Sequence, residues 1–505
     1  MKYLVDGNQM KAIDNYSINE LGIPSLILME KAAMACAKVI LDTIKDDEKI
    51  VAVCGTGNNG GDGIATARIL KEAGLDVSVL LIGEEEKVSE QTKKQLEIGR
   101  HLDLPIFNYK NILNEEWIEE YNIVVDAMFG IGLSKPITGD YEFIINQINQ
   151  HHAKVFAIDI PSGVDAGTGN IWSTAVKADV TITFGYNKLG LVLYPGAEYA
   201  GTVIVEDIGF PQKALKAVCP KTFTYDLEDK GKLPRRNPYS NKGSFGKVLV
   251  IGGAKNMAGA AYLCAKSAYR MGAGLVKILT VEDNRIIMQA NLPEALLSTY
   301  TQEGFTKEWF LEELLWASVV VIGPGLSMDG VAEMMLDLVL ETVQVPLVID
   351  ADALNLIALH QKTEKIDHNR QIIITPHLKE MSRLANCEIS DITKDLIAFS
   401  KNAMKDKEYI LVLKDARTIV TDGDYSYVNL CGNSGMAVGG SGDVLTGVIG
   451  GLLAQGMIPF EAATLGVHFH ALAGDRAAKE KNEYSMIAGD ISKALIKEIS
   501  HEGIL

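Results

Sequence analysis

The sequence predicts an α/β protein built from two doubly wound α/β/α domains. Strand-like apolar runs alternate with helical stretches in both halves of the chain, which is typical of parallel sheets covered by helices. The 505 residues exceed what one hydrophobic core usually holds. A proline-containing segment of low periodicity separates the halves, so we expect domains at residues 1–224 and 225–505.

The first half begins with a predicted helix at residues 25–44, which follows Pro24 and carries apolar residues on one face. Predicted strands then occur at residues 50–54, 77–82, 123–126, 155–160, 180–184 and 203–205. This alternation predicts a Rossmann-like domain. Ligands bind such sheets beyond the carboxyl ends of the strands, so the residues directly after each run are the first candidates for a site.

Residues 210–242 are predicted to be a linker, because their charge is mixed and prolines recur at 211, 220, 234 and 238. Beyond the linker the α/β pattern resumes, with predicted strands at residues 248–251, 276–280, 319–322, 347–350, 372–375 and 410–413. Residues 444–457 are uncharged and mostly apolar, but they fall short of the ~20 residues that span a bilayer. We expect a buried helix there.

Composition limits the possible partners. Lys and Arg number 48 against 65 Asp and Glu, and the formal charge of −17 argues against nucleic acid or an anionic membrane as a partner. The six cysteines show no Cys-x-x-Cys pair, so we expect free thiols in a reducing compartment rather than zinc or disulfides. The start of the chain turns polar by Asp6 and lacks an apolar signal core, which predicts a cytoplasmic protein.

A glycine-rich loop at residues 432–447 is the strongest candidate for a catalytic site. Gly439, Gly440 and Gly442 precede the predicted helix, so amide N–H groups there can point outward and favour a phosphate or an oxyanion. A carboxylate beside an anion site repels the anion, so its presence there calls for a functional reason. Asp443 could accept a proton from a hydroxyl that attacks phosphorus, and the alternative is that it only caps the helix.

Residues 55–63 form a second glycine-rich loop, which follows the first predicted strand and contains Gly-x-Gly-x-x-Gly. The pattern alone allows an ordinary dinucleotide-binding loop with Glu84 as the ribose-binding acid. Two asparagines and Asp62 in the loop argue against it, because their side chains would stand where a pyrophosphate needs bare backbone. The loop is better suited to hydroxyl and amide recognition, or to a cation.

Three oxygen donors come from neighbouring strand ends in this half: Asn59, Asp126 and Ser162. Hard oxygen ligands of low total charge suit a cation such as potassium better than zinc. The spacing alone favours structural hydrogen bonding as the explanation of these residues.

Four motifs of the first half together resemble the epimerase domain of the bifunctional NAD(P)H-hydrate repair enzymes. They are Asn-Asn-Gly-Gly-Asp at 58–62, Asp-Ala-Met-Phe-Gly-Ile-Gly-Leu at 126–133, Asp-Ile-Pro-Ser-Gly-Val at 159–164 and Phe-Gly-x-x-Lys-x-Gly at 184–190.

The resemblance implies that potassium is held by Asn59, Asp126 and Ser162. It makes Asp159 the expected acid/base, with Lys188 as a second candidate that would otherwise be read as a solvated surface lysine. It implies that the hydrated dinucleotide is bound by Asn58, Asn59, Gly60, Gly61, Asp62, Gly130, Ile131, Gly132, Leu133, Ser134, Lys135, Pro136 and Asp159.

The second half contains no Gly-x-x-x-x-Gly-Lys-[Ser/Thr], which excludes P-loop chemistry. Its strand ends and the loop at 432–447 resemble the ribokinase-like kinases, and the loop together with residues 253–274 resembles the NAD(P)H-hydrate dehydratase branch. Thr-Pro-His-x-x-Glu at 375–380 favours the dehydratase over the vitamin kinases of that group, several of which have asparagine in place of the histidine.

The dehydratase resemblance makes Asp443 the base, and Glu380 is expected to hold magnesium through water. Substrate binding is implied for Ala260, Gly325, His377 and Asp443, and nucleotide binding for Lys414, Asp415, Ala416, Arg417, Thr418, Gly439, Gly440, Ser441 and Gly442. His468 and His470 leave a helix in different directions, and we assign them no chemistry.

The two resemblances imply repair of hydrated NADH and NADPH, with potassium, magnesium and a homo-oligomeric state expected. The first half would epimerise the R and S hydrates, and the second would dehydrate the S hydrate with ADP or ATP through a phosphorylated intermediate. The alternatives are a ribokinase-like vitamin or sugar kinase with a non-catalytic Rossmann-like binding domain, or a half that serves only as a scaffold.

Overall fold

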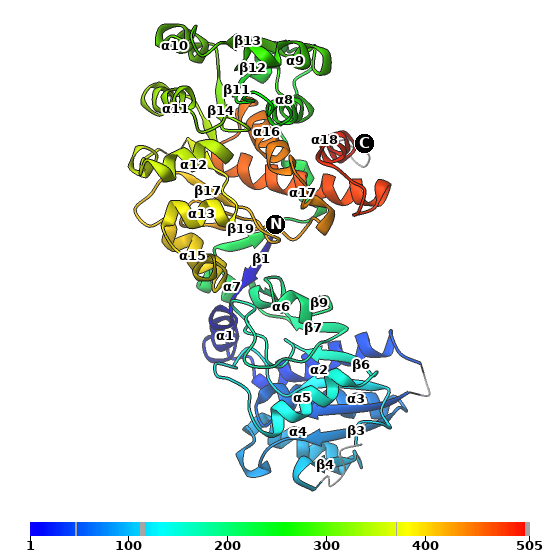
Figure 1. Cartoon of the computed structure of the whole chain (residues 1–505). Coiled ribbons are helices and arrows are strands. Elements are labelled where there is room, and N and C mark those ends of the chain that lie inside the picture. Colours follow the sequence, from blue (N-terminus) through cyan, green and yellow to red (C-terminus); the bar gives the residue numbers. More distant parts are fainter. Residues whose placement is uncertain (46–47, 112–116, 370, 500–505) are drawn as a thin grey trace. The chain divides into compact units, whose positions relative to one another are not determined.

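The structure is a computed structural model that describes residues 1–45, 48–111, 117–369 and 371–499. Contacts divide the chain into two compact units (Figure 1): Tyr3–Pro220 forms the first, and Met1–Lys2 together with Lys221–Leu505 forms the second. This boundary lies four residues before the one predicted between residues 224 and 225. Both units are α/β, as predicted.

The first unit is built on a parallel sheet with the strand order β4-β3-β2-β5-β6-β7-β9. The chain moves outward from β2 to β4 and then returns to β5, so β2 and β5 flank a switch point in strand order, where a crevice forms at their carboxyl ends. Each predicted strand end lies within two residues of the observed one. The strands are β2 (Lys49–Cys54), β3 (Asp76–Leu81), β4 (Ile106–Asn108), β5 (Ile123–Ala127), β6 (Lys154–Ile158), β7 (Val180–Phe184) and β9 (Thr202–Glu206).

Helices cover both faces of this sheet. Ile50 and Ala52 of β2 join a buried cluster with α2, α3 and α4, whereas Val51 and Val53 join a different cluster with α5. Because successive side chains of a strand point to opposite faces, this division is what a doubly wound sheet requires. The helices are α1 (Gly7–Asn15), α2 (Ser25–Leu41), α3 (Asn58–Glu72), α4 (Glu90–His101), α5 (Asp140–Gln150), α6 (Gly196–Tyr199) and α7 (Gln212–Val218), and β1 (Lys2–Val5) pairs with β8 (Asn187–Lys188).

The described strands of the second unit follow the order β13-β12-β11-β14-β15-β16-β17-β18-β19-β10. Pairing is parallel from β13 to β17 and at β19–β10, and antiparallel at β17–β18 and β18–β19. The strands are β10 (Thr222–Thr224), β11 (Lys247–Ile251), β12 (Leu275–Val281), β13 (Leu296–Tyr300), β14 (Val319–Ile322), β15 (Leu347–Ile349), β16 (Ile372–Ile374), β17 (Ile410–Leu413), β18 (Ile419–Thr421) and β19 (Ser426–Val428).

Four of these strands, β10, β13, β18 and β19, were not predicted from the sequence. β10, β18 and β19 have three residues each, too few to show a period-two pattern. The segment predicted to be a linker contains both β10 and α7. Each of them packs within its own unit, and this packing outweighs the proline-rich local sequence.

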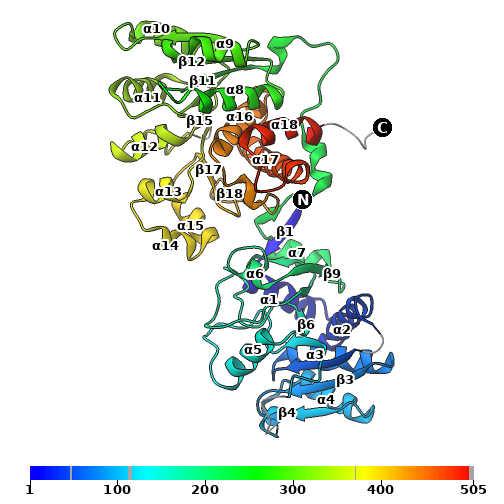
Figure 2. The ribbon, with the colours of Figure 1, turned by 45° about the vertical axis from the view of Figure 1, so that its right-hand side comes forward.

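Helix α16 (Ser441–Ala454) lies at the centre of the second unit, against α8 and α17 (Figure 2). A Cβ at Gly447 would lie 2.1 Å from the carbonyl oxygen of Cys264, so only glycine allows α8 to approach this closely. Residues 444–453 are all buried, which confirms the predicted buried helix. Among the described residues, no helix is both long and apolar enough to cross a membrane.

The remaining helices of the second unit surround its sheet (Figure 1). They are α8 (Ala258–Arg270), α9 (Arg285–Asn291), α10 (Lys307–Leu315), α11 (Gly330–Thr342), α12 (Ala351–Leu359), α13 (Leu378–Ala385), α14 (Ile389–Thr393), α15 (Leu396–Ala403), α17 (Pro459–Lys481) and α18 (Ala488–Ile499).

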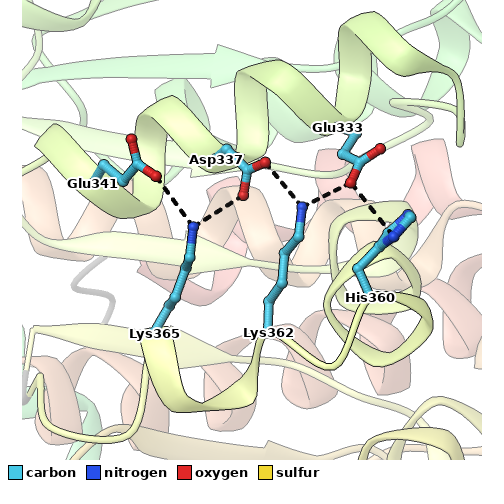
Figure 3. Close-up of polar contacts among 6 residues, drawn as sticks. All are labelled: Glu333, Asp337, Glu341, His360, Lys362 and Lys365. Carbon is cyan, nitrogen blue, oxygen red and sulfur yellow. Dashed lines mark hydrogen bonds and ion pairs between the residues drawn. The ribbon is translucent and has the colours of Figure 1, made fainter.

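A ladder of charges ties α11 to the segment that follows α12 (Figure 3). Three carboxylates spaced one turn apart on α11 face His360, Lys362 and Lys365. Lys362 Nζ lies 2.9 Å from carboxylate oxygens of both Glu333 and Asp337. Lys365 Nζ lies 3.2 Å from oxygens of Asp337 and Glu341. The side chain of Lys362 is 13% exposed and that of Lys365 39%, so water screens the second lysine more than the first.

We therefore expect Lys362→Met to lower the free energy of unfolding by about 1–2 kcal/mol and Lys365→Met by about 0.5 kcal/mol or less. Burial opposes the charge of Asp337, but the two lysines outweigh it and lower the pKa of Asp337. Stability from such a carboxylate is present above its unfolded pKa and is lost as the pH falls through its folded pKa. Denaturant unfolding at pH 7 and pH 2 measures both effects, and equal losses for the two variants would contradict the ladder.

Candidate active sites

A cavity of about 580 Å³ lies in the first unit at the carboxyl ends of β2, β5 and β6. Lys188 lines it. The predicted substrate-binding residues that line it are Asn58, Asn59, Asp62, Gly130, Ile131, Gly132, Leu133, Ser134, Lys135 and Asp159. The other three, Gly60, Gly61 and Pro136, are not among the lining residues.

Gly60 and Gly61 are buried in the first turn of α3. A Cβ at Gly60 would lie 1.9 Å from the carbonyl oxygen of Gly55, and a Cβ at Gly61 would lie 2.7 Å from Cε of Met29. These two glycines therefore allow the loop to pack closely against Gly55 and Met29, and this packing explains why glycine is needed at both positions.

The Asp159–Lys188 pair lies on the cavity wall. Lys188 is completely buried, and its Nζ lies 2.8 Å from Asp159 Oδ1. The ammonium also donates to Thr183 Oγ1 (2.8 Å) and to the carbonyl oxygen of Phe184 (2.9 Å). A buried ammonium is costly unless it is paired and hydrogen-bonded. The reading of Lys188 as a solvated surface lysine is therefore wrong.

Asp159 itself has a φ of 68°, which is unfavourable for a residue other than glycine. This conformation ends β6 at Ile158, two residues before the predicted end of the strand. The backbone is thus bent at the point where the Asp159 side chain enters the cavity.

Two further carboxyl groups line the same cavity, Asp62 and Asp14. Burial, together with the negative charges of Asp159 and Asp14, raises the pKa of Asp62 well above its usual value. Burial and Asp159 also raise the pKa of Asp14. The cavity therefore combines carboxyl groups whose pKa values are raised with a carboxylate that is paired to a lysine. The sequence analysis did not single out Asp14.

Two of the three predicted potassium ligands, Asp126 and Ser162, are hydrogen-bonded to each other, and the third, Asn59, lines the cavity. Asp126 is completely buried; Oδ2 accepts from Ser162 N (2.7 Å), and Oδ1 accepts from Ser162 Oγ (2.6 Å) and Met128 N (3.2 Å). Burial raises the pKa of Asp126 to about 6 although these hydrogen bonds oppose the shift. Among the described residues, Asn59 Nδ2 is buried without a hydrogen-bond partner, so the fold does not use this nitrogen.

The second site centres on Asp443, in the first turn of α16. The N-cap of α16 is Gly440, with a φ of 91°, and no side chain caps the helix. Among the described residues, the Asp443 carboxyl makes no hydrogen bond or ion pair. The alternative that Asp443 caps the helix is therefore wrong. Burial and the charges of Asp350 and Asp352 raise the pKa of Asp443 to about 7, while Lys414 opposes the shift.

A buried ion pair lies next to Asp443. Lys414 Nζ lies 2.8 Å from Asp350 Oδ1, and Thr446 Oγ1 donates to Asp350 Oδ2 (2.6 Å). Burial alone would raise the pKa of Asp350, but Lys414 outweighs it and holds that pKa below its usual value. A Cβ at Gly442 would lie 3.3 Å from Lys414 Nζ, so the ammonium stands beside the start of α16. The sequence analysis named Lys414 but assigned no role to Asp350 or Thr446.

The predicted nucleotide-binding residues occupy two neighbouring segments. Lys414, Asp415, Ala416, Arg417 and Thr418 form the turn between β17 and β18. Gly439, Gly440, Ser441 and Gly442 form the turn into α16, and they are all at least partly exposed. The position of the Lys414 ammonium beside Gly442 brings the two segments together.

The i, i+3 spacing of His377 and Glu380 predicts that the two side chains share a helix face. The structure corrects this, because His377 is the N-cap of α13, and its Nδ1 accepts from the amides of Lys379 (3.1 Å) and Glu380 (3.2 Å). Glu380 Oε2 accepts from His377 N (2.8 Å), which completes a capping box. Burial and Lys414 lower the pKa of His377, so this half-exposed imidazole is neutral at pH 7.

Ala260 and Gly325, the remaining predicted substrate contacts, are neighbours. Gly325 has a φ of 56°, and a Cβ there would lie 3.1 Å from Cβ of Ala260 and 3.0 Å from the carbonyl oxygen of Met257. A side chain at residue 325 would therefore be both strained and crowded.

Helix α17 holds the glycine-rich loop at two points. Asp475 Oδ2 accepts from Gly432 N and Oδ1 accepts from Asn433 Nδ2, both at 3.0 Å. His470 Nε2 lies 3.4 Å from Ser441 Oγ, and burial lowers the pKa of His470 to about 4. His470 thus contacts the predicted site as a neutral side chain. His468 is buried beside Tyr427, away from these loop residues.

Comparisons with known proteins cover both halves of the chain. A family model described as NAD(P)H-hydrate dehydratase matches residues 248–497, and one described as YjeF-related protein N-terminus matches residues 25–190. The bifunctional NAD(P)H-hydrate repair enzyme of Moorella thermoacetica is 37% identical, over 97% of this chain and 95% of its own. That of Coxiella burnetii is also 37% identical, over 97% and 98%.

The chain belongs to the family of bifunctional NAD(P)H-hydrate repair enzymes. A crystal structure of a ribokinase-like superfamily protein from Enterococcus faecalis is 29% identical, with a TM-score of 0.50, and covers 55% of this chain and 95% of its own. The ribokinase-like fold predicted for the second half is therefore confirmed. α1 lies outside both regions that the family models match, although it lines the cavity of the first unit.

The Lys414–Asp350 pair generates a stability prediction for this family member. Lys414→Met leaves a buried carboxylate without its cation, so we expect a loss of about 3 kcal/mol or more in unfolding free energy at pH 7. In the variant, burial would raise the Asp350 pKa above its unfolded value, and ionisation would then oppose folding as the pH rises. The loss should shrink near pH 3. Denaturant unfolding at both values checks this, and a loss that does not depend on pH would contradict the pairing.

Proposed function

We propose that this chain repairs hydrated NADH and NADPH. Its first unit interconverts the R and S hydrates, and its second unit dehydrates the S hydrate in a reaction that consumes ADP or ATP. The observation that carries the second activity is a carboxyl group with a pKa near 7 at a glycine-lined helix N-terminus, next to a paired lysine. The full-length match to repair enzymes favours this function over a vitamin or sugar kinase.

In the dehydratase site Asp443 accepts the proton of the substrate hydroxyl as the hydroxyl oxygen attacks the terminal phosphorus of the nucleotide. The bond to the bridging oxygen breaks, and the nucleotide leaves with one phosphoryl group fewer. Amides of residues 440–442 and the Lys414 ammonium stabilise the transferred group. The lone pair of the ring nitrogen then expels phosphate, and loss of a proton from the adjacent carbon restores the dihydropyridine.

Magnesium fits this site only as an ion bound mainly by phosphates and water. Among the described residues, no group of three His, Cys, Asp or Glu side chains could hold a metal ion. Glu380 is committed to the capping box through Oε2, and its carboxylate could still hold a metal-bound water. The ion would neutralise phosphate charge when bound.

In the epimerase site the donor set fits a potassium ion. Asp126 supplies a buried negative charge with no lysine or arginine beside it among the described residues, and Ser162 Oγ and the side-chain carbonyl oxygen of Asn59 would supply neutral ligands. The ion would add positive charge to the cavity wall when bound. Asp159 and Lys188 hold and move the proton at the hydroxyl oxygen of the hydrate.

Location and assembly complete the proposal. All six cysteines are free thiols, which supports the reducing cytoplasm. The homo-oligomeric state is a separate expectation, and light scattering of the purified chain measures it.

Replacement of Asp443 by Asn tests the dehydratase. Asp443→Asn keeps the size of the side chain but removes the proton acceptor, so turnover of the S hydrate should fall at least 100-fold with little change in nucleotide affinity. In the unchanged enzyme, kcat/KM should rise with pH through about 7 and then level off. Recovery of the NADH absorbance band is the assay, and near-normal turnover in the variant would end this mechanism.

The same variant separates catalysis from stability. Because the folded-state pKa of Asp443 is raised, its ionisation opposes folding as the pH rises from about 4 to 7. Asp443→Asn should therefore be at least as stable as the unchanged chain at pH 8.

Removal of the buried carboxylate tests the cation. We expect Asp126→Ala to lose the dependence of epimerisation on potassium and to epimerise at least tenfold more slowly, while S-hydrate dehydration by the same polypeptide is retained. Titration with potassium and sodium chlorides, together with thermal unfolding of the first unit, provides the measurement. Loss of dehydration alone would refute the assignment.

A further inference from the structure

Helix α1 forms one wall of the epimerase cavity. Met10, Lys11 and Asp14 of α1 line the cavity, and so does Ile18 of the π-helical turn Tyr16–Glu20 that follows. Short π-helical segments are frequent at functional sites. This wall precedes residue 25, where the family match begins, so none of the motifs in the sequence pointed to it.

The residues of this wall share one face of the helix. Gly7, Lys11 and Asp14 are spaced by four and three residues, which places them in one row. A Cβ at Gly7 would lie 3.1 Å from the carbonyl oxygen of Ile131, so the row begins directly against the loop at residues 130–136. Asp6 fixes the start of the helix by accepting from Gln9 N (2.8 Å) in a capping box. The Asp14 side chain is thereby set on the cavity side of a well-anchored helix.

The Asp14 carboxyl has no structural task that explains its position. It is half-buried, and among the described residues it makes no hydrogen bond or ion pair. Polar groups that are removed from water without a partner cost free energy, and such a group in a cavity, with a pKa shifted by burial and a nearby charge, is a candidate functional residue. Asp159 lines the same cavity and is close enough for its charge to raise the pKa of Asp14.

We propose that Asp14 is a second catalytic acid/base of the epimerase cavity, acting with Asp159 on the hydroxyl of the hydrate. The proposal rests on the epimerase function proposed above. It adds a group that the motif residues do not provide, because inversion through cleavage of the carbon–oxygen bond requires that oxygen leave from one face of the ring and return on the other.

The step balances as follows. The protonated Asp14 carboxyl donates its proton to the hydroxyl oxygen as the carbon–oxygen bond breaks, and the oxygen departs with the bonding pair as water. The lone pair of the ring nitrogen forms a carbon–nitrogen double bond. Water then adds to the other face, returns the electron pair to nitrogen and gives a proton to the Asp159 carboxylate. A proton passes from Asp159 to Asp14 to reset the pair, and the reverse reaction exchanges the two roles.

The protonation states required by this step agree with the electrostatics of the cavity. Burial and Asp159 raise the pKa of Asp14, which favours the acid form, while Lys188 lies 2.8 Å from Asp159 and supports its carboxylate. The other titratable groups lining the cavity are Lys11, Asp62, Lys135 and Lys188.

The test compares Asp14→Asn with the unchanged full-length chain. We expect R-hydrate conversion, measured in the presence of excess S-specific dehydratase activity, to fall about 100-fold in kcat. Dehydration of the S hydrate by the same polypeptide should be unchanged, which provides an internal control. Glu20→Gln makes the same change of carboxyl to amide at an exposed residue that does not line the cavity, and it should epimerise at the normal rate.

The pH profile distinguishes an acid from a structural residue. In the unchanged enzyme, the rate of epimerisation should decline at high pH as Asp14 loses its proton. This decline is the alkaline limb of the pH profile, and it should be absent from the residual activity of Asp14→Asn. Asp14→Glu, which retains a carboxyl group, should recover part of the rate and the limb. Persistence of the limb in Asp14→Asn would overturn the proposal and assign the acid to Asp62, and normal kcat in Asp14→Asn would overturn it outright. Failure of the unchanged chain to interconvert the hydrates would instead refute the epimerase function itself.

Discussion

Parallel strands deliver their carboxyl ends to one edge of a sheet, and both sites of this chain depend on that constraint. In the first unit it brings together Asn59, Asp126 and Asp159 from the ends of β2, β5 and β6. In the second it places Asp350, which follows β15, beside Lys414, which follows β17. Residues far apart in the chain become neighbours because the strands that they follow lie side by side in one parallel sheet. No motif in the local sequence is needed for this.

Burial then divides the carboxyl groups of each site into two kinds. Asp350 and Asp159 are paired with lysines, and Lys414 lowers the pKa of Asp350. Asp443 and Asp62 lack such a partner among the described residues, and desolvation raises the pKa of each. One type of side chain can thus serve both as a fixed negative charge and as a group that exchanges a proton near neutral pH, because the environment decides which form is favoured.

Much of the fold was predictable from the sequence, for reasons of local chemistry. Buried parallel strands are continuous apolar runs, and every strand predicted from such a run is present to within two residues. The short strands β10, β18 and β19 were missed because three residues carry too little pattern, and α7 was hidden among prolines. In the sites, the residues that belong to compact motifs were found and those outside motifs were not. Asp14, Asp350 and Asp475 are examples of the second group.

The sequence by itself determined the two α/β units, the glycine-rich loops and the family, and it pointed to Asp443 and Asp159 as candidate reactive carboxylates, because each is encoded by residues close together in the chain. Only the tertiary structure decided that Lys188 is buried against Asp159, that His377 caps α13, and that Asp443 does not cap α16. It also decided which carboxylates are paired, since Lys414 and Asp350 are 64 residues apart. A pKa depends on distances and burial in three dimensions, and a linear pattern contains neither.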